Sequence, residues 1–240
     1  MLESGLIVGN YRVIRLLGKG GMGCVYLVKH LTLGVEYAMK VLKDDAAESD
    51  EYVARFLREG KLASHIRHPN LIAVYDAGRD SRTGLYYLVM DYVSGGTLAG
   101  RIQKDGALPP HQALAIVRQV ALALDAAAAQ GMVHRDIKPA NIMFDADGRV
   151  RVADLGIAKR RGDDETTMTR DDAVFGTPAY MSPEQARDTG KVDVRSDIYS
   201  LGMVLWHALT GARPYADSTA MAIFMSVLDK RPLPDVREGC

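Results

Sequence analysis

Six residues near the start of the chain, Gly18-Lys19-Gly20-Gly21-Met22-Gly23, constrain the fold more than any other feature. The spacing G-x-G-x-x-G occurs in turns that bind dinucleotides, but such a turn must open a helix whose N-terminus meets the pyrophosphate. Residues 24–28 instead read Cys-Val-Tyr-Leu-Val, which is typical of a strand. The glycines therefore join two antiparallel strands, which disfavours a dinucleotide-dependent enzyme. Taken alone, the turn is either a flexible hairpin or a loop whose backbone N–H groups approach phosphate oxygens.

The first ninety residues are dominated by short runs rich in Val, Tyr and Leu and separated by turn residues. These runs predict strands at 11–17, 24–30, 35–42, 70–77 and 85–92. Between the third and fourth strands, residues 50–67 carry apolar side chains at helical spacing. The N-terminal part is therefore predicted to be an antiparallel sheet with one helix.

The pattern changes after the sequence Ser-Gly-Gly at 94–96. An amphipathic helix is predicted over 109–130, and two short strands over 142–144 and 150–153 flank an Asp-Ala-Asp-Gly turn. The charged, Thr-rich segment 159–177 has no periodicity and is predicted to be a mobile loop. Further helices are predicted at 196–210 and 218–228. The chain is thus expected to consist of a small β lobe followed by a larger helical lobe.

Composition excludes several classes of protein. Hydrophobic residues make up 48% and charged residues 25%, as in ordinary globular domains. Thirty basic residues balance thirty acidic ones, so nothing favours a nucleic acid or an anionic membrane as a partner. Two cysteines cannot build a disulfide framework, and no signal peptide or bilayer-spanning segment is recognisable. We therefore expect a cytoplasmic chain without nucleic acid partners or a membrane segment.

Four further motifs follow the glycine-rich turn in a fixed order. They are Ala38-Met39-Lys40, the run from His134-Arg135-Asp136 through Lys138 to Asn141, Asp154-Leu155-Gly156, and Ser182-Pro183-Glu184 followed by Asp197. This ordered set resembles the protein kinase superfamily, and it is most similar to bacterial, eukaryotic-like serine/threonine protein kinases. The resemblance extends from about residue 11 to residue 215.

The resemblance implies an α+β, bilobal protein-kinase-like fold in one catalytic domain spanning 1–240. The N-terminal antiparallel β lobe with one helix would cover about 1–92, and the mostly helical C-terminal lobe about 93–240. The C-terminal lobe is expected to be short and to lack the last helices of the family. On this ground Glu184 is expected to lack the arginine that pairs with it in the family, and the chain is interpreted as a fragment or a truncated form.

The implied activity is transfer of the γ-phosphate of ATP to Ser and Thr hydroxyls of protein substrates. The implied cofactors are ATP and Mg²⁺, with Mn²⁺ as an alternative metal, and the oligomeric state is left open. The alternative is a pseudokinase or a truncated nucleotide-binding scaffold without efficient transfer. Retention of Lys40, Glu59, Asp136, Asn141 and Asp154 argues against that alternative.

The catalytic roles follow the chemistry of phosphoryl transfer, which needs positioning and charge neutralisation. Lys40 is a point cation suited to the α- and β-phosphates, and Glu59 on the predicted helix borders its buried face, where an ion pair with Lys40 would remove the cost of an unpaired charge. Asp136 is the candidate base for the substrate hydroxyl. By resemblance, Lys138 steadies the γ-phosphate.

Nucleotide and metal sites are also assigned. Asn141 and Asp154 offer the hard oxygen ligands that Mg²⁺ prefers. By resemblance, Met90 is the gatekeeper, and the segment after it recognises adenine through its backbone. The predicted ATP-binding residues are Gly18, Lys19, Gly20, Gly21, Met22, Gly23, Val25, Ala38, Lys40, Met90, Asp91, Val93 and Met143.

Regulation is inferred from the loop between Asp154 and Glu184. In the family, the arginine before the catalytic aspartate, here Arg135, pairs with a phosphate on this loop. We expect autophosphorylation at Thr167 or Thr169, with solvated loop threonines as the alternative. The chain departs from the common motifs at Leu155, which stands where phenylalanine is usual, and at Ser182, which stands where alanine is usual. Neither change removes a group that the chemistry needs.

Overall fold

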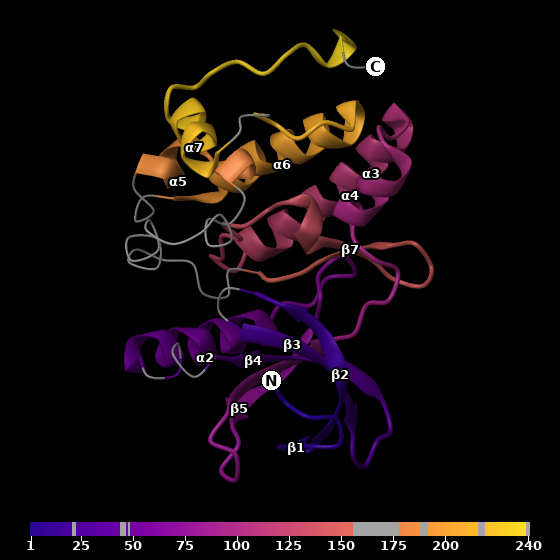
Figure 1. Cartoon of the computed structure of the whole chain (residues 1–240), viewed down its shortest axis with the longest axis vertical. Coiled ribbons are helices and arrows are strands. Elements are labelled where there is room, and N and C mark those ends of the chain that lie inside the picture. The colour runs from indigo at the N-terminus through magenta and orange to yellow at the C-terminus, as the bar shows by residue number, and fades with distance from the viewer. Residues whose placement is uncertain are drawn as a thin grey trace. The chain divides into compact units, whose positions relative to one another are not determined.

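The structure, a computed structural model, describes residues 1–20, 23–43, 47, 49–155, 178–187, 192–215 and 219–238 (Figure 1). The chain divides into two compact units. Unit 1 contains residues 1–67 and 72–93, and unit 2 contains residues 68–71 and 94–240. The predicted loop 159–177, with Thr167 and Thr169, lies outside the described residues, as do Gly21, Met22 and Gly156.

The described part of unit 1 is built around a six-stranded sheet with the strand order β1-β2-β3-β4-β6-β5. All neighbouring strands pair antiparallel, as predicted. The strands are β1 (Ile7–Val8), β2 (Tyr11–Lys19), β3 (Gly23–His30), β4 (Glu36–Leu42), β5 (Val74–Arg79) and β6 (Tyr86–Asp91). The two-residue strand β1 is too short to have a periodicity, and it was not predicted.

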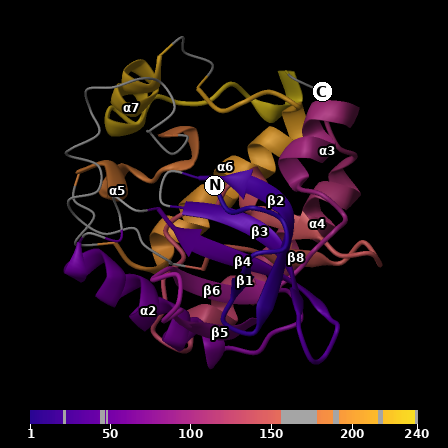
Figure 2. The same ribbon diagram turned by 60° about the horizontal axis from the view of Figure 1, so that its bottom comes forward.

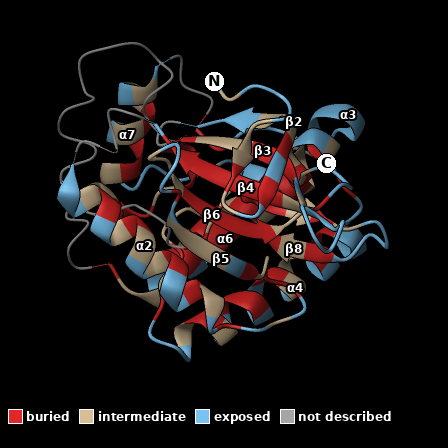
Figure 3. Cartoon of the chain, turned by 90° about the horizontal axis from the view of Figure 1, so that it is seen from below, coloured by how far each residue is buried: buried red, intermediate tan, exposed pale blue. Residues whose placement is uncertain are grey.

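One face of this sheet forms a hydrophobic core. Alternate residues of β3, β4 and β6 point to the same face, and Tyr26, Met39 and Val89 are directly opposite one another in the ladder. They pack in a buried cluster with Val13 and Tyr11. Figure 3 shows these central strands largely in the colour of buried residues. Burial of this cluster fixes the strand register, because a slip of one residue would expose it.

Helix α2 (Asp50–Ser64) is the predicted helix of unit 1, and it contacts β5 and β6 beside the sheet (Figure 2). Ser49 caps its N-terminus by accepting a hydrogen bond from the backbone N–H of Tyr52. Val53, Phe56 and Ala63 are buried, so the apolar stripe read from the sequence faces the sheet.

The described part of unit 2 is mostly helical. Its helices are α3 (Leu98–Asp105), α4 (Pro110–Ala128), α5 (Pro183–Arg187), α6 (Val194–Thr210) and α7 (Ala220–Leu228), with short 3₁₀ turns at Pro139–Asn141, Pro178–Tyr180 and Val236–Glu238. Helices α4 and α6 pack against each other, and β7 (Ile142–Phe144) pairs antiparallel with β8 (Val150–Val152). The sequence predicted α4, α6, α7 and the hairpin, but it missed α3 and α5.

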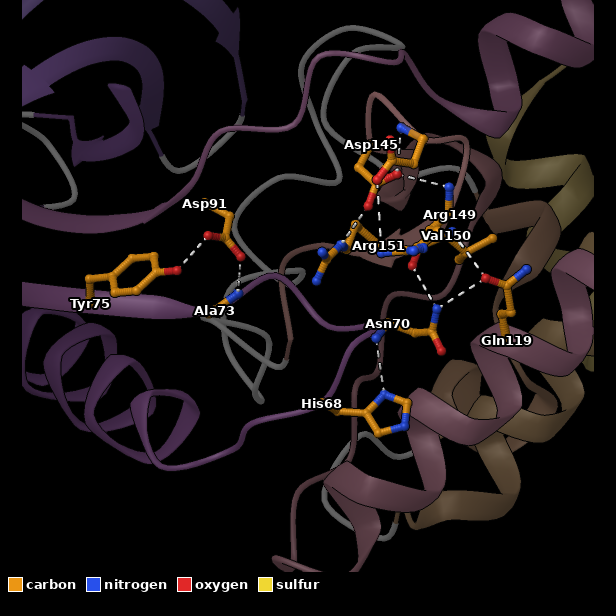
Figure 4. A network of polar contacts seen from close by, with 11 residues as sticks. His68, Asn70, Ala73, Tyr75, Asp91, Gln119, Asp145, Arg149, Val150 and Arg151 are labelled. Atoms are coloured by element: carbon orange, nitrogen blue, oxygen red, sulfur yellow. Dashed lines mark hydrogen bonds and ion pairs between the residues drawn. The ribbon is translucent and has the colours of Figure 1, made fainter. Parts of the chain in front are cut away.

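The predicted strand at 70–77 began too early. Residues 68–71 belong to unit 2, and β5 begins only at Val74. The Asn70 side chain donates to the Val150 carbonyl at 2.9 Å and to Gln119 Oε1 at 3.1 Å, which ties this segment to β8 and α4 (Figure 4). A polar side chain with such distant partners leaves no periodic signal in the sequence. None of the described helices combines the length and apolar character needed to cross a bilayer.

Candidate active site

The glycine-rich turn lies between β2 and β3, as predicted. Lys19 is directly opposite Cys24 in the ladder, and the Gly20 N–H donates to the Gly23 carbonyl at 2.8 Å. Gly23 has a structural requirement of its own, because a Cβ there would collide with the Val41 carbonyl oxygen. Glycine at this position thus permits close strand pairing in addition to any role in ligand binding.

Four predicted nucleotide-site residues of unit 1 share one face of the sheet. Lys40 is directly opposite Val25 on β3, and Ala38 is directly opposite Met90 on β6. Since side chains alternate along a strand, the two pairs point to the same side, opposite to the Tyr26 cluster. Lys40 is only 9% exposed, which is unusual for a lysine and points to a role other than solvation. Met90 and Ala38 are also buried.

Glu59 lies on α2 and is half-buried. The neighbouring Gly60 packs against Leu88, so closely that a Cβ on Gly60 would lie 2.5 Å from Leu88 Cδ1. Leu88 is directly opposite Lys40 in the ladder. The helix therefore covers the sheet face that carries Lys40, and this placement favours the predicted Lys40–Glu59 ion pair, which stays a prediction.

The side chain of Asp91 has a role that the sequence did not indicate. Its carboxylate accepts hydrogen bonds from the Ala73 N–H at 3.0 Å and from the Tyr75 hydroxyl at 2.7 Å (Figure 4). The hydrogen bond to Asp91, together with burial, raises the pKa of Tyr75 to about 12, so this hydroxyl donates. The Asp91 N–H bonds to the Ala73 carbonyl. Of its backbone groups, the carbonyl is thus the better candidate for adenine recognition. Val93, also predicted here, is buried.

In unit 2, the segment around Asp136 is organised by a buried carboxylate on α6. Asp197 is 2% exposed and accepts hydrogen bonds from the His134 and Arg135 N–H groups, each at 2.8 Å. Burial raises the pKa of Asp197, and the two N–H donors oppose this rise by favouring the charged form. His134 Nε2 also meets the Ala153 carbonyl at 2.8 Å, which links this segment to the end of β8.

Asp136 is the centre of a short hydrogen-bond network. Its Oδ2 atom accepts from Lys138 Nζ at 2.9 Å and from Asn141 Nδ2 at 3.0 Å. Asn141 Nδ2 also donates to the Asp136 carbonyl at 2.8 Å. Asp136 and Lys138 retain 24% and 21% side-chain exposure, so the pair is open to a ligand. The structure thus brings together three of the predicted catalytic and metal residues.

The two predicted metal ligands lie on adjacent backbone segments of unit 2. Asn141 precedes β7, and the N–H of Ala153, which precedes Asp154, donates to the Asn141 carbonyl at 2.9 Å. Because the Asn141 amide nitrogen is bound to Asp136, its side-chain oxygen is the end left for a cation. A carboxylate and an amide oxygen fit Mg²⁺. The described residues contain no group of three or more His, Cys, Asp or Glu arranged for a metal.

Met143, the nucleotide-site residue predicted in unit 2, lies on β7. It is directly opposite Arg151 and forms an isolated bridge with Thr97, and its side chain is half-buried. Within the turn that follows, Asp145 Oδ1 accepts hydrogen bonds from the N–H groups of Asp147 and Arg149. This confirms that the two aspartates belong to the predicted turn.

Residues 178–187 are anchored on α6. The Ser196 hydroxyl donates to Glu184 Oε1 at 2.6 Å, so the carboxylate expected to lack an arginine has a serine partner. This hydrogen bond and others outweigh burial and lower the pKa of Glu184. Tyr180 contacts His207 Nδ1 at 2.6 Å. Gln185, which the sequence did not single out, donates to the Arg135 carbonyl.

Known proteins are similar to this chain in both sequence and fold. Serine/threonine-protein kinase PrkC of Bacillus subtilis is 42% identical over 228 residues, which cover 95% of this chain and 34% of PrkC. Serine/threonine-protein kinase PknB of Mycobacterium leprae is 42% identical over 227 residues, covering 94% and 36%. The chain thus spans about a third of the length of these relatives.

Among solved structures, the kinase domain of Mycobacterium tuberculosis PknI superposes with a TM-score of 0.72 and 34% identity, covering 95% of this chain and 87% of that domain. A point mutant of the same domain gives a TM-score of 0.75 at 33% identity, covering 100% and 84%. The family described as the protein kinase domain matches residues 11–236, which include every motif considered above. On this match over nearly its whole length, the chain belongs to the protein kinase family.

Proposed function

We propose that the chain is a catalytic domain that transfers the γ-phosphate of ATP to Ser and Thr hydroxyls of protein substrates. The observation that carries this proposal is the Asp136 network, in which Lys138 and Asn141 both bind one carboxylate oxygen. Such a network holds a base in one orientation beside a cation suited to phosphate. The kinases PrkC and PknB, named as serine/threonine-protein kinases, support the choice of acceptor.

In the proposed reaction, the substrate hydroxyl oxygen forms a bond to the γ-phosphorus while the bond from that phosphorus to the β-γ bridging oxygen breaks. ADP leaves with the bridging oxygen, and Asp136 accepts the hydroxyl proton. Lys138, 2.9 Å from Asp136 Oδ2, neutralises charge on the phosphoryl group during the transfer.

Unit 1 would supply the nucleotide contacts. Lys40, buried on the face shared with Val25, Ala38 and Met90, would bind the α- and β-phosphates, and the backbone of the glycine-rich turn would approach the phosphate oxygens. The side-chain oxygens of Asn141 and Asp154 would hold a divalent cation, Mg²⁺ or Mn²⁺. When bound, that cation neutralises phosphate charge.

The test is transfer of labelled phosphate from ATP to a generic protein substrate in the presence of Mg²⁺. We expect Asp136→Asn to lower kcat by at least about a hundredfold, because it replaces a positioned base with an amide. The matched control is Asp147→Asn, which changes an exposed carboxylate in the turn after β7 and should retain activity. Equal transfer by the parent and Asp136→Asn would contradict the proposal, and nucleotide binding without any transfer would indicate a pseudokinase.

We further propose that Thr167 or Thr169 is autophosphorylated and that the phosphate pairs with Arg135. This proposal rests on the position of both threonines between the Asp154 and Glu184 motifs. Mass spectrometry after incubation with Mg²⁺ and ATP should find phosphate at one of these sites, and Asp136→Asn should abolish it. Sustained catalysis with phosphate at neither site would contradict the proposal.

A further inference from the structure

The first turn of α5 is closed by a reciprocal pair of hydrogen bonds between Ser182 and Gln185. The Ser182 hydroxyl accepts from the Gln185 N–H at 3.2 Å, and Gln185 Oε1 accepts from the Ser182 N–H at 3.0 Å. This is a capping box of the type S-x-x-Q, and both residues are buried. Ser182 stands where alanine is usual in the family's motif, and its hydroxyl caps the N-terminus of α5.

Gln185 has a second partner outside its own helix. Its Nε2 atom donates to the Arg135 carbonyl oxygen at 2.9 Å, across fifty positions of sequence. The two polar atoms of the Gln185 amide thus bind different segments. The oxygen accepts the hydrogen bond that completes the capping box, and the nitrogen donates to the segment that carries Asp136. A glutamate could complete the box equally well. Glutamine, unlike glutamate, also has an N–H donor for the Arg135 carbonyl.

Arg135 has a backbone conformation that needs stabilising contacts. Its φ angle is 64°, in the left-handed region that is costly for a residue with a Cβ. Its N–H group donates to Asp197 Oδ1 at 2.8 Å, and its carbonyl accepts from Gln185 Nε2. A side chain of α6 therefore binds the N–H group of Arg135, and a side chain of α5 binds its carbonyl group. Both contacts lie directly before Asp136 in the chain.

We propose that Gln185 is a positioning residue for Asp136. Through its amide nitrogen it holds the Arg135 carbonyl, and with Asp197 it keeps the backbone before the catalytic base in its left-handed conformation. This inference rests on the proposed phosphotransfer function for its kinetic consequence, but the restraint on the backbone is a property of unit 2 alone. It also connects residues 178–187 to the catalytic centre through a defined hydrogen bond.

The decisive substitution is Gln185→Glu, which keeps the oxygen for Ser182 and places a carboxylate oxygen against the Arg135 carbonyl. We expect kcat to fall by about tenfold to a hundredfold, as for a modest misplacement of a catalytic group, while the KM for ATP stays near that of the parent. The matched control, Gln103→Glu, makes the same change on the exposed face of α3 and should leave kcat unchanged.

The pH dependence separates positioning from a general loss of structure. Protonation of the introduced carboxyl group gives it an O–H donor for the Arg135 carbonyl, so the ratio of variant to parent kcat should rise from about pH 8 to about pH 6. Gln185→Met, of similar length but without a titratable group, should also lose kcat, and its ratio to the parent should stay flat. It serves in place of Gln185→Glu if that variant does not fold.

Hydrogen exchange tests the restraint without depending on catalysis. Gln185→Glu should accelerate amide exchange in peptides that contain residues 134–138, whereas Ser182→Ala, which removes only the capping hydroxyl, should accelerate exchange within 182–187 and retain kcat within about twofold of the parent. A folded Gln185 variant with parental kcat, or with exchange changes confined to 182–187, would overturn the proposal. An inactive parent would refute the proposed function, and the exchange data would still decide this inference.

Discussion

The conformation of His134 and Arg135 depends on one carboxylate, that of Asp197. Because it accepts two backbone N–H groups at 2.8 Å while 2% exposed, an amide in its place would turn an N–H donor toward one of those N–H groups. We expect Asp197→Asn to lower the free energy of unfolding by about 2 to 4 kcal/mol, the scale for loss of a buried charged acceptor.

Urea denaturation of the parent and of two variants measures this loss. The matched control is Asp193→Asn, which alters the half-exposed carboxylate at the N-cap of α6, where asparagine caps as well as aspartate does. Similar unfolding free energies for the two variants would contradict the structural role assigned to Asp197.

His207 makes the folding stability of the chain depend on pH, with stability falling as the pH falls. Burial and the nearby Arg213 charge lower the pKa of His207 below its ordinary value of about 6.5. Burial raises the pKa of Tyr180 to about 12, so its hydroxyl stays protonated and, 2.6 Å from Nδ1, can donate to the neutral His207 ring. Because the unfolded chain binds the proton more tightly, this contribution to stability is complete above about pH 6.5 and is lost as the pH falls through the folded-state pKa.

We expect His207→Phe, which keeps an aromatic ring beside Tyr180, to lose about 1 kcal/mol of stability at neutral pH. The difference between parent and variant should shrink on acidification below about pH 6.5, when the parent begins to lose its own contribution. Urea denaturation across this range measures both curves, and a constant difference would show that His207 does not titrate differently in the folded chain.

Single residues differed in how readily the sequence revealed them. Asp136, Lys138 and Asn141 lie within six positions, and their motif order indicated a shared site that the structure places in one network. Gln185 was missed because its partner lies fifty positions away. Asp91 was predicted to recognise adenine through its backbone, and the sequence did not indicate that its carboxylate bonds to Ala73 and Tyr75. Long-range hydrogen bonds of this kind have no periodic signature.

Among the elements, α2 is held to the sheet by a close approach at Gly60. A Cβ there would meet the fully buried Leu88 at 2.5 Å, and Leu88 is enclosed and cannot move aside freely. In an isolated helix, alanine would be favoured over glycine by about 1 kcal/mol. Here we expect Gly60→Ala to destabilise the chain by about 1 to 3 kcal/mol, because overpacking displaces the helix.

The displacement of α2 should also reach the neighbouring Glu59. We therefore expect Gly60→Ala to lower kcat/KM, measured with the same phosphotransfer assay, in addition to the loss seen by urea denaturation. The control Gly202→Ala lies on α6, where a Cβ would meet nothing within 4 Å, and it should be neutral or stabilising. Equal behaviour of the two variants would argue against the tight α2–sheet contact.

The predictability of an element depended on its length and pattern. The strands β2 to β4, the helix α2 and the long helix α4 were predicted because alternation or helical spacing persists over several turns or residues. The short elements β1 and α5 were not predicted, because segments of two and five residues are too short to show a periodic pattern. The order of the strands, with β6 between β4 and β5, could not be read from local pattern because it depends on contacts between distant segments.

For the whole molecule, the sequence predicted a boundary between two lobes near Ser-Gly-Gly 94–96, and the first compact unit of the structure ends at residue 93. It did not reveal that residues 68–71 belong to unit 2, because their attachment depends on Asn70 bonding to Val150 and Gln119. Each unit carries groups that the proposed reaction requires: Lys40 in the first, and Asp136, Lys138 and Asn141 in the second.

Ligand-linked stability tests this distribution in the intact chain. A ligand that binds only the folded chain adds about 2.7 kcal/mol at a hundredfold excess over its Kd, which for a chain of this size raises Tm by roughly 5 to 10 °C. We expect this shift for a non-hydrolysable ATP analogue with Mg²⁺. The shift should shrink when EDTA removes the metal, because the phosphate charge is then no longer neutralised.

Lys40→Met should reduce the same thermal shift, since it removes the buried cation proposed to bind the α- and β-phosphates. Lys29→Met is the matched control, because Lys29 is an exposed lysine on the adjacent strand β3. Comparing shifts rather than absolute Tm values cancels any effect of either substitution on the ligand-free chain. An undiminished shift in Lys40→Met would place the phosphate contacts elsewhere, whereas a shift lost only in Lys40→Met would tie nucleotide binding to the sheet face shared by Val25, Ala38 and Met90.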